Sequence, residues 1–322
     1  MKYAVEQMNI LGKAGIPFFF MFDFELIMPV IHTLNNLPED LIISTGLFDN
    51  SDPARRDNYK KITLKSEPVS FNEYRKAFDN VIMNISHGNS YLLNLTFPTK
   101  ISTDASLEEI FYCSRAKYRL LFADKFVVFS PEAFVKIEQN GTIRSFPMKG
   151  TIDASVPDAE RMILRDEKEK SEHNTIVDLI RNDMSMNAEN VILERYRYID
   201  AIDTPEGRLL QVSSEIAGLL GPGWESRAGT IITSMLPAGS ISGAPKKETI
   251  RIIKESEIDD RGYYTGVFGV FNGKELDSAV MIRFIEQNDT GYVYRSGGGI
   301  TFLSQIEKEY EELIKKIYVP AG

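Results

Sequence analysis

The chain has 322 residues, of which 43% are hydrophobic and 26% charged, and its formal net charge is −9. This composition is that of a globular protein, and the length allows one large domain or two ordinary ones. The negative charge argues against a protein that wraps nucleic acid or coats anionic membranes. A single cysteine, Cys113, excludes an internal disulfide, and with only three histidines a zinc site is not expected.

The most apolar run, "IPFFFMF" at 16–22, is too short to cross a bilayer and is interrupted by Asp23 and Glu25. No secretory leader precedes it. We therefore expect a cytoplasmic protein. Since no internal repeat, low-complexity tract or flexible linker divides the sequence, we also predict a single domain over residues 1–322.

Helical periodicity is clear at 70–87, where Ser70 and Glu73 form a capping-box pair. Further helices are predicted at 104–116, 157–183, 225–235, 245–257 and 304–317. Runs rich in Val, Ile, Phe and Tyr predict strands within 125–151, 264–287 and 291–302, with Asn140-Gly141 and Asn272-Gly273 as hairpin turns. This order predicts an α+β fold, with antiparallel sheets flanked by helices.

Lys149 has unusual neighbours in the segment "SFPMKGT" at 145–151. Phe146, Pro147 and Met148 precede it, and a glycine and a threonine follow. Lysines usually lie where water reaches them, so a lysine in an apolar segment that we expect to turn tightly is a candidate for chemistry.

The predicted helix at 157–183 carries carboxylates on its apolar side. At about 100° per residue, its buried stripe is Met162, Ile176, Leu179 and Ile180. Glu169 and Glu172 fall inside that stripe, whereas the opposite, solvated face carries Glu167, Lys170 and Asp178. Buried carboxylates need a partner, which is either a metal cation or a basic side chain.

The last predicted helix repeats this feature. Its apolar face consists of Ile306, Tyr310, Leu313 and Ile317, and its outward face of Glu307, Lys308, Glu311 and Lys315. Glu309, Glu312 and Lys316 cluster along the edge of the apolar face. A Glu312–Lys316 pair alone is typical of a surface ion pair. Two helices that each direct Glu-x-x-Glu inward also suit a hard divalent cation, above all Mg²⁺.

Three further features leave alternatives open. Three consecutive glycines at 297–299 indicate either a bulge or a strand whose bare N–H groups accept a ligand carboxylate. Arg283 faces either solvent or the interior, where it would clamp a carboxylate. Glu132 follows a strand that Pro131 breaks, and is either a surface residue or an acid in a cleft. Together the residues describe a small polyanionic ligand held with a divalent metal.

Seven collinear segments between Ser70 and Lys316 resemble the chorismate-utilising enzymes, which are anthranilate synthase and aminodeoxychorismate synthase large subunits, isochorismate synthases and salicylate synthases. The segments are "GNSYLLNLT" (88–96), "SPE" (130–132), "PMKGT" (147–151), "EKEKSEHNTIVDLIRND" (167–183), "LPAGSISGAPK" (236–246), "RGYYTGVFG" (261–269) and "SGGGIT…EKEYEEL" (296–313). The resemblance implies antiparallel sheets packed as a sandwich with helices outside. It also implies a shortened N-terminal region at 1–65 and a catalytic core at 66–318.

Anthranilate synthases resemble this chain but carry alanine where Lys149 stands, and the subset with lysine is the aminodeoxychorismate synthases. The resemblance implies that Lys149 attacks C2 of chorismate as the C4 hydroxyl leaves. Ammonia from a separate glutamine amidotransferase then adds at C4, giving 4-amino-4-deoxychorismate for 4-aminobenzoate and folate biosynthesis. No amidotransferase segment is visible in the chain. Apolar neighbours and a nearby metal would lower the pKa of Lys149 and free its amine.

The resemblance assigns roles to the other candidates. Glu132 would be the general acid, Glu172 and Glu312 would bind Mg²⁺ directly, and Glu169 and Glu309 would support the ion through water. The residues expected to bind substrate are Thr151, Tyr264, Arg283, Gly297, Gly299 and Lys316. Gln211 stands where the family usually has histidine, so an acid/base role at that position is in doubt. The alternatives are anthranilate synthase component I, an isochorismate or salicylate synthase, or a non-catalytic metabolite-binding protein.

Overall fold

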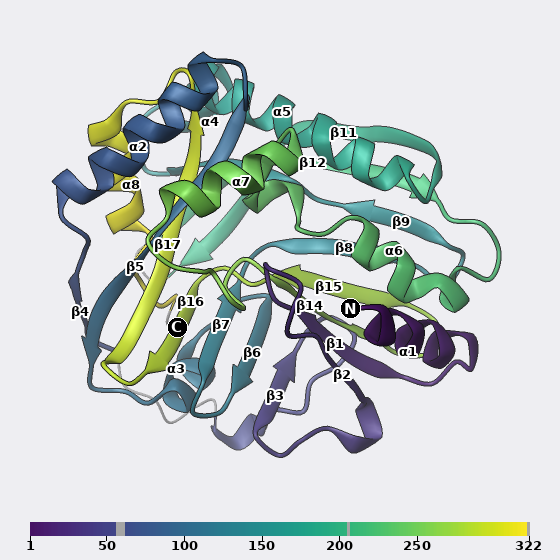
Figure 1. Cartoon of the computed structure of the whole chain (residues 1–322). Coiled ribbons are helices and arrows are strands. Elements are labelled where there is room, and N and C mark those ends of the chain that lie inside the picture. Colours follow the sequence, from purple (N-terminus) through teal and green to yellow (C-terminus); the bar gives the residue numbers. More distant parts are fainter. Residues whose placement is uncertain (56–61, 205–206, 321–322) are drawn as a thin grey trace.

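The computed structural model describes residues 1–55, 62–204 and 207–320, and it contains two antiparallel sheets (Figure 1). In the described residues, the first sheet has nine strands. Eight of them follow one another in the order β10 (Met148–Asp153), β12 (Gly207–Leu219), β9 (Thr142–Ser145), β8 (Ala133–Ile137), β15 (Leu276–Val280), β14 (Val267–Phe271), β1 (Phe18–Phe22) and β2 (Val30–Thr33). The ninth strand, β11 (Glu189–Thr204), pairs with β12. The eight-stranded second sheet has the order β13 (Gly243–Ala244), β5 (Leu92–Thr103), β17 (Gly291–Thr301), β16 (Phe284–Asn288), β7 (Phe126–Ser130), β6 (Tyr118–Phe122) and β3 (Leu41–Ser44), with β4 (Leu64–Glu67) paired to β5.

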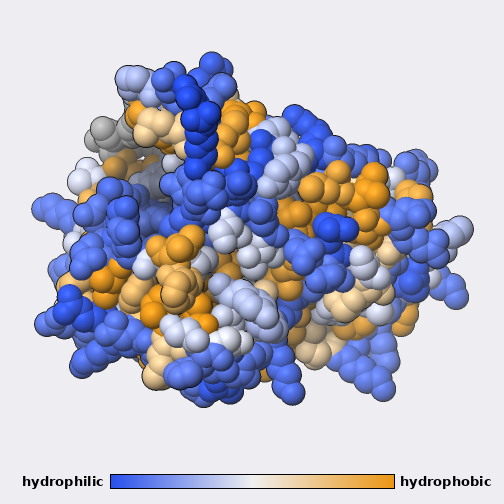
Figure 2. Space-filling view, turned by 90° about the horizontal axis from the view of Figure 1, so that it is seen from above, coloured by the Kyte–Doolittle hydropathy of each residue, from blue (hydrophilic) through white to orange (hydrophobic). Residues whose placement is uncertain are grey.

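The helices cover the outer faces of the two sheets. They are α1 (Lys2–Lys13), α2 (Phe71–Ser86), α3 (Leu107–Cys113), α4 (Ala159–Arg165), α5 (Glu167–Ser185), α6 (Ala228–Ser234), α7 (Lys246–Ser256) and α8 (Ile306–Lys315). Single 3₁₀ turns lie at η1 (Leu34–Asn36), η2 (Pro53–Arg55), η3 (Trp224–Arg227) and η4 (Gly239–Ile241). Figure 1 shows α2, α7 and α8 gathered at the upper end of β5 and β17. Figure 2 looks down on this side of the molecule and shows a largely hydrophilic surface with apolar patches.

Strand β1 shows how the apolar sequence builds the sandwich. Phe18, Phe20 and Phe22 pack on one face, in a core with α1, α6 and α7. Phe19 and Met21 pack on the other, in the core between the sheets with side chains of β3, β6, β7 and β16. Successive side chains of a strand point to opposite faces, so this run of five fully buried residues fits a strand with a core on each side. The predicted α+β sandwich with helices outside is confirmed.

Both predicted hairpin turns are also confirmed. Asn140-Gly141 joins β8 to β9, and Asn272-Gly273 joins β14 to β15. Gly141 and Gly273 have φ angles of +82° and +100°, a backbone conformation that side chains with a Cβ rarely adopt.

The predicted helices are present, with one correction. Residues 157–183 form two helices, α4 and α5, because Asp166 has an extended backbone and caps α5 by accepting a hydrogen bond from the N–H of Glu169. Winding the segment as one helix was therefore wrong for its first turns. Met162 is 53% exposed, and the buried residues of α4 are Ala159 and Ile163.

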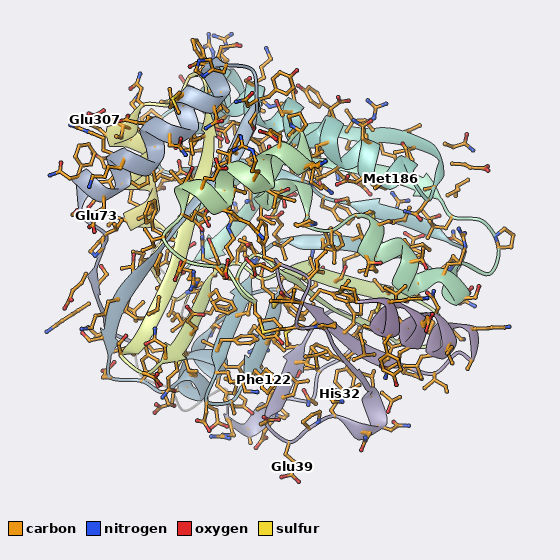
Figure 3. The ribbon with its side chains drawn as sticks, viewed as in Figure 1. His32, Glu39, Glu73, Phe122, Met186 and Glu307 are labelled. Atoms are coloured by element: carbon orange, nitrogen blue, oxygen red, sulfur yellow. The ribbon has the colours of Figure 1, made fainter. Side chains whose placement is uncertain are left out.

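The Ser70–Glu73 capping box of α2 is present. Figure 3 shows Glu307 on the outer side of α8, as predicted for its outward face. In the described part of the chain, no helix combines the length and apolarity that crossing a membrane requires. The division into an N-terminal region and a catalytic core stays a prediction, and residues 56–61 of that region lie outside the described residues.

Candidate active site

Glu132 and Arg283 lie where the chain crosses from one sheet to the other. Strand β7 of the second sheet continues through Pro131 and Glu132 into β8 of the first, and β15 returns through Arg283 into β16. The two crossings are joined, since Phe129 N donates to Arg283 O at 3.1 Å and Val280 N donates to Glu132 O at 3.2 Å. Arg283 has a φ of +53°, which marks the sharp change of direction. The crossings thus place an acidic and a basic side chain at the junction of the two sheets.

The three glycines of β17 lie beyond the stretch that pairs with β16. Strand β16 pairs with β17 only as far as Phe284 opposite Arg295, because β16 begins at the crossing. Lys316 Nζ donates to Gly297 O at 2.7 Å. Because N–H and C=O of one residue point to the same side of an extended strand, the N–H of Gly297 also faces away from β5. Strand β17 pairs with β5 from Tyr292 to Thr301 without a register shift, so the glycines form no bulge.

Lys149 lies in a bulged strand rather than in a tight turn. Met148 pairs with Ser213 and Thr151 with Gln211, so β10 carries one extra residue between these pairs. Gly150 has a φ of +84°, which accommodates the bulge. The side chain of Lys149 is 17% exposed, and its Nζ lies 3.7 Å from Glu172 Oε2. The lysine therefore points toward the carboxylates and not into bulk solvent.

Three of the four predicted glutamates lie beside the glycine segment. A Cβ built on Gly299 would lie 2.6 Å from Glu172 Oε2, and one on Gly298 would lie 3.2 Å from Glu312 Oε1 and 3.8 Å from Glu309 Oε2. Glu172 and Glu309 are each 3% exposed. Glu169 lies at the edge of this group, with its Oε2 3.3 Å from a Cβ built on Gly150. Bare backbone thus lets carboxylates from α5 and α8 approach one strand.

Sequence reasoning missed Lys168, which joins the two helices. Its Nζ lies 2.7 Å from Glu309 Oε1 and 3.1 Å from Glu172 Oε1. Burial by itself would lower the pKa of Lys168, but Glu172 and Glu309 raise it above its ordinary value. The Lys168-x₃-Glu172 spacing of an i, i+4 ion pair is the signal in the sequence that could have revealed it.

The carboxyl groups of the site titrate differently because their surroundings differ. Burial and the neighbouring Glu172 raise the pKa of Glu169 to about 7. Burial would also raise the pKa of Glu312. However, Lys316 Nζ lies 2.6 Å from Glu312 Oε1, and this positive charge lowers the pKa of Glu312 to about 2. Burial raises the pKa of Glu132, against a hydrogen bond with Ser240 and the charge of Lys149. Glu132 therefore has the property of a general acid.

The donor set fits a magnesium ion in its chemistry. Glu172 Oε1 and both side-chain oxygens of Glu309 are buried and accept no hydrogen bond of good geometry from the described residues, so the ammonium of Lys168 is their nearest counter-charge. Carboxylate oxygens without donors are what Mg²⁺ prefers. Among the described residues, however, no three Asp, Glu, His or Cys side chains converge as an assembled metal site. Mg²⁺ therefore stays a prediction.

Arg283 is placed to hold an anion. Its Nη2 donates to Tyr318 OH at 3.5 Å, and its guanidinium lies over the Tyr318 ring, 5.0 Å from the centroid. Within residues 1–55, 62–204 and 207–320, no carboxylate forms an ion pair with it. Tyr264 is 3% exposed, packs against Phe284 and contributes to the charge environment of Arg283. Thr151, by contrast, is exposed, and in the described part of the chain its side chain forms no hydrogen bond.

His173 is a second residue that sequence reasoning missed. It is 1% exposed, and its Nε2 lies 2.6 Å from Ser214 Oγ on β12. Burial and the charge of Arg197 lower its pKa to about 4, which keeps the ring neutral near pH 7. His173 therefore ties α5, and with it Glu172, to the strand that pairs with the bulge of Lys149.

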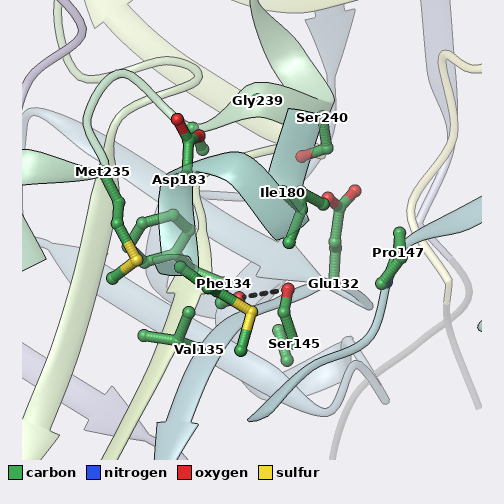
Figure 4. Close-up of a pocket in the computed structure, with 13 residues that line it drawn as sticks. Glu132, Phe134, Val135, Ser145, Pro147, Ile180, Asp183, Met235, Gly239 and Ser240 are labelled. Carbon is green, nitrogen blue, oxygen red and sulfur yellow. Dashed lines mark hydrogen bonds between the residues drawn. The ribbon is translucent and has the colours of Figure 1, made fainter. Parts of the chain in front are cut away.

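A small cavity lies behind Glu132 (Figure 4). It has a volume of about 20 Å³ and is lined in part by Ile180, Asp183, Met235 and Ser240. Figure 4 shows the carboxylate of Glu132 directed toward Ser240. This volume holds about one water molecule, so a dicarboxylate the size of chorismate does not fit there. A substrate would therefore have to bind elsewhere, and the charges of Lys149, Lys316 and Arg283, which act on Glu132, mark the neighbouring region.

Comparisons with known proteins show the family to which the chain belongs. The family model described as chorismate binding enzyme matches residues 29–322. An uncharacterized PabA-like protein of Pasteurella multocida is 49% identical over 324 residues, covering 99% of this chain and 98% of that protein. Anthranilate synthase component 1 of Aquifex aeolicus is 34% identical over 202 residues, covering 58% of this chain and 38% of that protein.

Among solved structures, the menaquinone-specific isochorismate synthase MenF of Escherichia coli has the same fold. It superposes with a TM-score of 0.70 at 13% identity, covering 98% of this chain and 80% of that one. A match of this kind supports the architecture only. The family model covers most of the sequence, and the close relative spans nearly all of it. The chain therefore belongs to the chorismate binding enzyme family.

Proposed function

We propose that this chorismate-utilising enzyme is component I of an aminodeoxychorismate synthase. It would convert chorismate and ammonia to 4-amino-4-deoxychorismate and water, with ammonia supplied by a separate glutamine amidotransferase. The observation that carries the proposal is the position of Lys149. Its side chain is held in a strand bulge, 17% exposed, and directed at the carboxylate cluster across from Glu132 and Arg283.

In the first half of the proposed reaction, the neutral amine of Lys149 forms a bond to C2 of chorismate. The ring double bonds shift, the bond from C4 to its hydroxyl breaks, and Glu132 donates the proton with which the hydroxyl leaves as water. Burial supports this role, since it raises the pKa of Glu132 and keeps a proton on the carboxyl group. The product of this half is a substrate ring bound covalently to Lys149, with Glu132 left as a carboxylate.

In the second half, ammonia forms a bond to C4, the double bonds shift back, and the bond from C2 to Lys149 breaks. Lys149 leaves with its electron pair as a neutral amine. The new ammonium group at C4 gives one proton to Glu132, which restores the acid. Atoms and charges balance, because chorismate has exchanged one hydroxyl for one amino group and one water has been released.

The charged residues near Glu132 suggest how the two substrate carboxylates would be bound. Arg283 would pair with the enolpyruvyl carboxylate, helped by Tyr264 and the N–H of Gly297. Glu172 and Glu312 would hold Mg²⁺, with Glu169 and Glu309 in support, and the ion would supply positive charge for the ring carboxylate. A chain with a net charge of −9 needs such local cations to bind a dicarboxylate.

Anthranilate synthase component I is the second candidate, supported by the name of the Aquifex relative. The two enzymes use the same substrate and the same nucleophile, ammonia, but differ in the carbon that is aminated. The lysine at position 149 favours the first candidate, because anthranilate synthases resemble this segment with alanine there.

The test is an incubation of the purified full chain with chorismate, Mg²⁺ and ammonium, with products separated and identified by mass. We expect 4-amino-4-deoxychorismate, and anthranilate or isochorismate in its place would overturn the proposal. We predict that Lys149→Ala loses this product or diverts turnover to anthranilate, because no amine remains to attack C2. Lys170→Ala is the matched control, since Lys170 pairs with Glu167 on the outer face of α5, away from the site.

The covalent step has its own readout. With chorismate but without ammonium, a peptide that contains Lys149 should gain the mass of chorismate less one water. Unchanged formation of 4-amino-4-deoxychorismate by Lys149→Ala would remove the lysine mechanism while leaving the reaction assignment intact.

A further inference from the structure

Lys168 lies between the two most deeply buried carboxylates of the site. Its ammonium is 2.7 Å from Glu309 Oε1 and 3.1 Å from Glu172 Oε1, and it reaches them from one turn before Glu172 on α5. The side chains of Glu172 and Glu309 are 4% and 2% exposed, whereas that of Lys168 is 24% exposed. One lysine thus supplies positive charge to carboxylates that come from two different helices.

The same oxygens are those that a divalent cation would need. In the part of the chain that the structure describes, Glu172 Oε1 and the Glu309 oxygens accept no hydrogen bond of good geometry, so their contact with the ammonium is mainly that of an ion pair. An ammonium at about 3 Å and a divalent ion at about 2 Å on the same oxygens would repel each other strongly, so binding of the ion favours withdrawal of the lysine. In the described part of the chain the carboxylates are not gathered into a group of three around one point.

Lys168 can leave without a change of fold. Its side chain is long, flexible and partly exposed, and α5 is held independently by the bond from His173 to Ser214. Loss of Lys168 would leave Glu309 without its ion-pair partner and Glu172 with only Lys149, 3.7 Å from its other oxygen, so it is favoured when another cation arrives, because an unpaired buried charge is strongly unfavourable. Release of the lysine and arrival of a metal are therefore coupled.

We propose that Lys168 is a built-in counter-cation that holds Glu172 and Glu309 in the metal-free protein and is displaced when a divalent cation binds. The inference rests on the proposed magnesium site. It assigns Lys168 a role in setting metal affinity, since the free energy of its ion pairs must be given up at each binding event. A lysine with a purely structural role would instead strengthen the site in every state.

The direct test measures Mg²⁺ binding to the purified full chain by calorimetry, without substrate. We expect Lys168→Met to bind Mg²⁺ about tenfold more tightly than the wild type, which corresponds to about 1.4 kcal/mol. The metal-free variant should melt about 2 °C lower than the wild type, and saturating Mg²⁺ should remove most of this difference. Lys170→Met, an exposed lysine of the same helix, is the matched control and should leave affinity unchanged.

Lys168→Arg separates charge from packing, since it keeps a cation at this position and should bind Mg²⁺ with wild-type affinity. The proposal is overturned if Lys168→Met binds Mg²⁺ as tightly as the wild type or more weakly. It is also overturned if Lys168→Arg gains as much affinity as Lys168→Met, or if neither the wild type nor any variant binds Mg²⁺. If Lys168→Met does not fold, Lys168→Gln takes its place.

A measurement on the wild type needs no variant. The rate at which an amine-acylating reagent modifies Lys168, read by peptide mass, should rise when Mg²⁺ is added, while the rate at Lys170 stays constant. An unchanged or lower rate at Lys168 contradicts displacement. None of these measurements involves turnover, so an unexpected reaction product would alter the proposed function and leave this inference standing.

Discussion

Gly299→Ala tests the position of Glu172 with one methyl group. A Cβ at residue 299 would lie 2.6 Å from Glu172 Oε2, and the closest ordinary contact of a Cβ is about 3.4 Å. The strand is held by its pairing to β5, so the side chain of Glu172 must give way by about 0.8 Å. Glu172 has little room to move, because it is 3% exposed and contacts Lys168 and Lys149.

The expected effect is a loss of activity with little loss of stability. Misplacement of a functional group by about 1 Å costs on the order of a hundredfold in rate, which corresponds to about 2.7 kcal/mol in the transition state. The φ angle of Gly299 is not in the left-handed region, so alanine adds no backbone strain there. We therefore expect the free energy of unfolding to change by less than about 1 kcal/mol.

The assay compares kcat/KM for chorismate with the free energy of unfolding from urea titration. Gly298→Ala is a graded variant, since its Cβ would lie 3.2 Å from Glu312 Oε1 and needs a shift of only about 0.2 Å. Gly221→Ala is the neutral control, because the nearest atom to its Cβ would be 3.9 Å away. Full activity of Gly299→Ala would refute the reasoning, as would equal losses in Gly298→Ala and Gly299→Ala.

Two further predictions concern the acid and the scaffold. Because burial raises the pKa of Glu132, the wild-type kcat should fall as pH rises through that pKa and the acid loses its proton. Glu132→Gln should lower kcat about 10²- to 10⁴-fold and abolish this fall of kcat at high pH. If the variant keeps the fall, another group causes it. Arg261 and Glu257 form an ion pair at 2.6 Å, and their side chains are 1% and 3% exposed. Arg261→Met should therefore reduce the free energy of unfolding, measured by urea titration, by about 3–5 kcal/mol. A loss below about 1 kcal/mol would show that the pair is dispensable for stability.

Local patterns in the sequence predicted several elements correctly. The capping box at Ser70, the two Asn-Gly turns and the apolar periodicity of α8 depend on neighbours within a few residues, so they are readable without the fold. The prediction failed at 157–183, because periodicity carries on through Asp166 whereas the backbone does not. A single capping aspartate gives a weak signal against more than twenty residues of helical pattern.

The inward position of the glutamates on α5 and α8 was also readable, because helical winding places residues on faces. Their proximity in space could not be predicted from the sequence. Glu172 and Glu309 are separated by more than a hundred residues, and only the packing of both helices on β17 brings them to one lysine. Lys168 went unnoticed because a lysine at i, i+4 from a glutamate is ordinary on a helix surface.

By itself, the sequence determined the α+β class, the helices that carry carboxylates inward and the unusual lysine at position 149, because these follow from composition, periodicity and local turn chemistry. Only the tertiary structure decided that Glu132 and Arg283 lie at the junction of the two sheets, that Lys149 lies in a bulge and that Lys168 contacts two buried carboxylates. The physical reason is that strand crossings between sheets, register and helix packing depend on contacts between residues far apart in the chain, and no pattern within one segment encodes them.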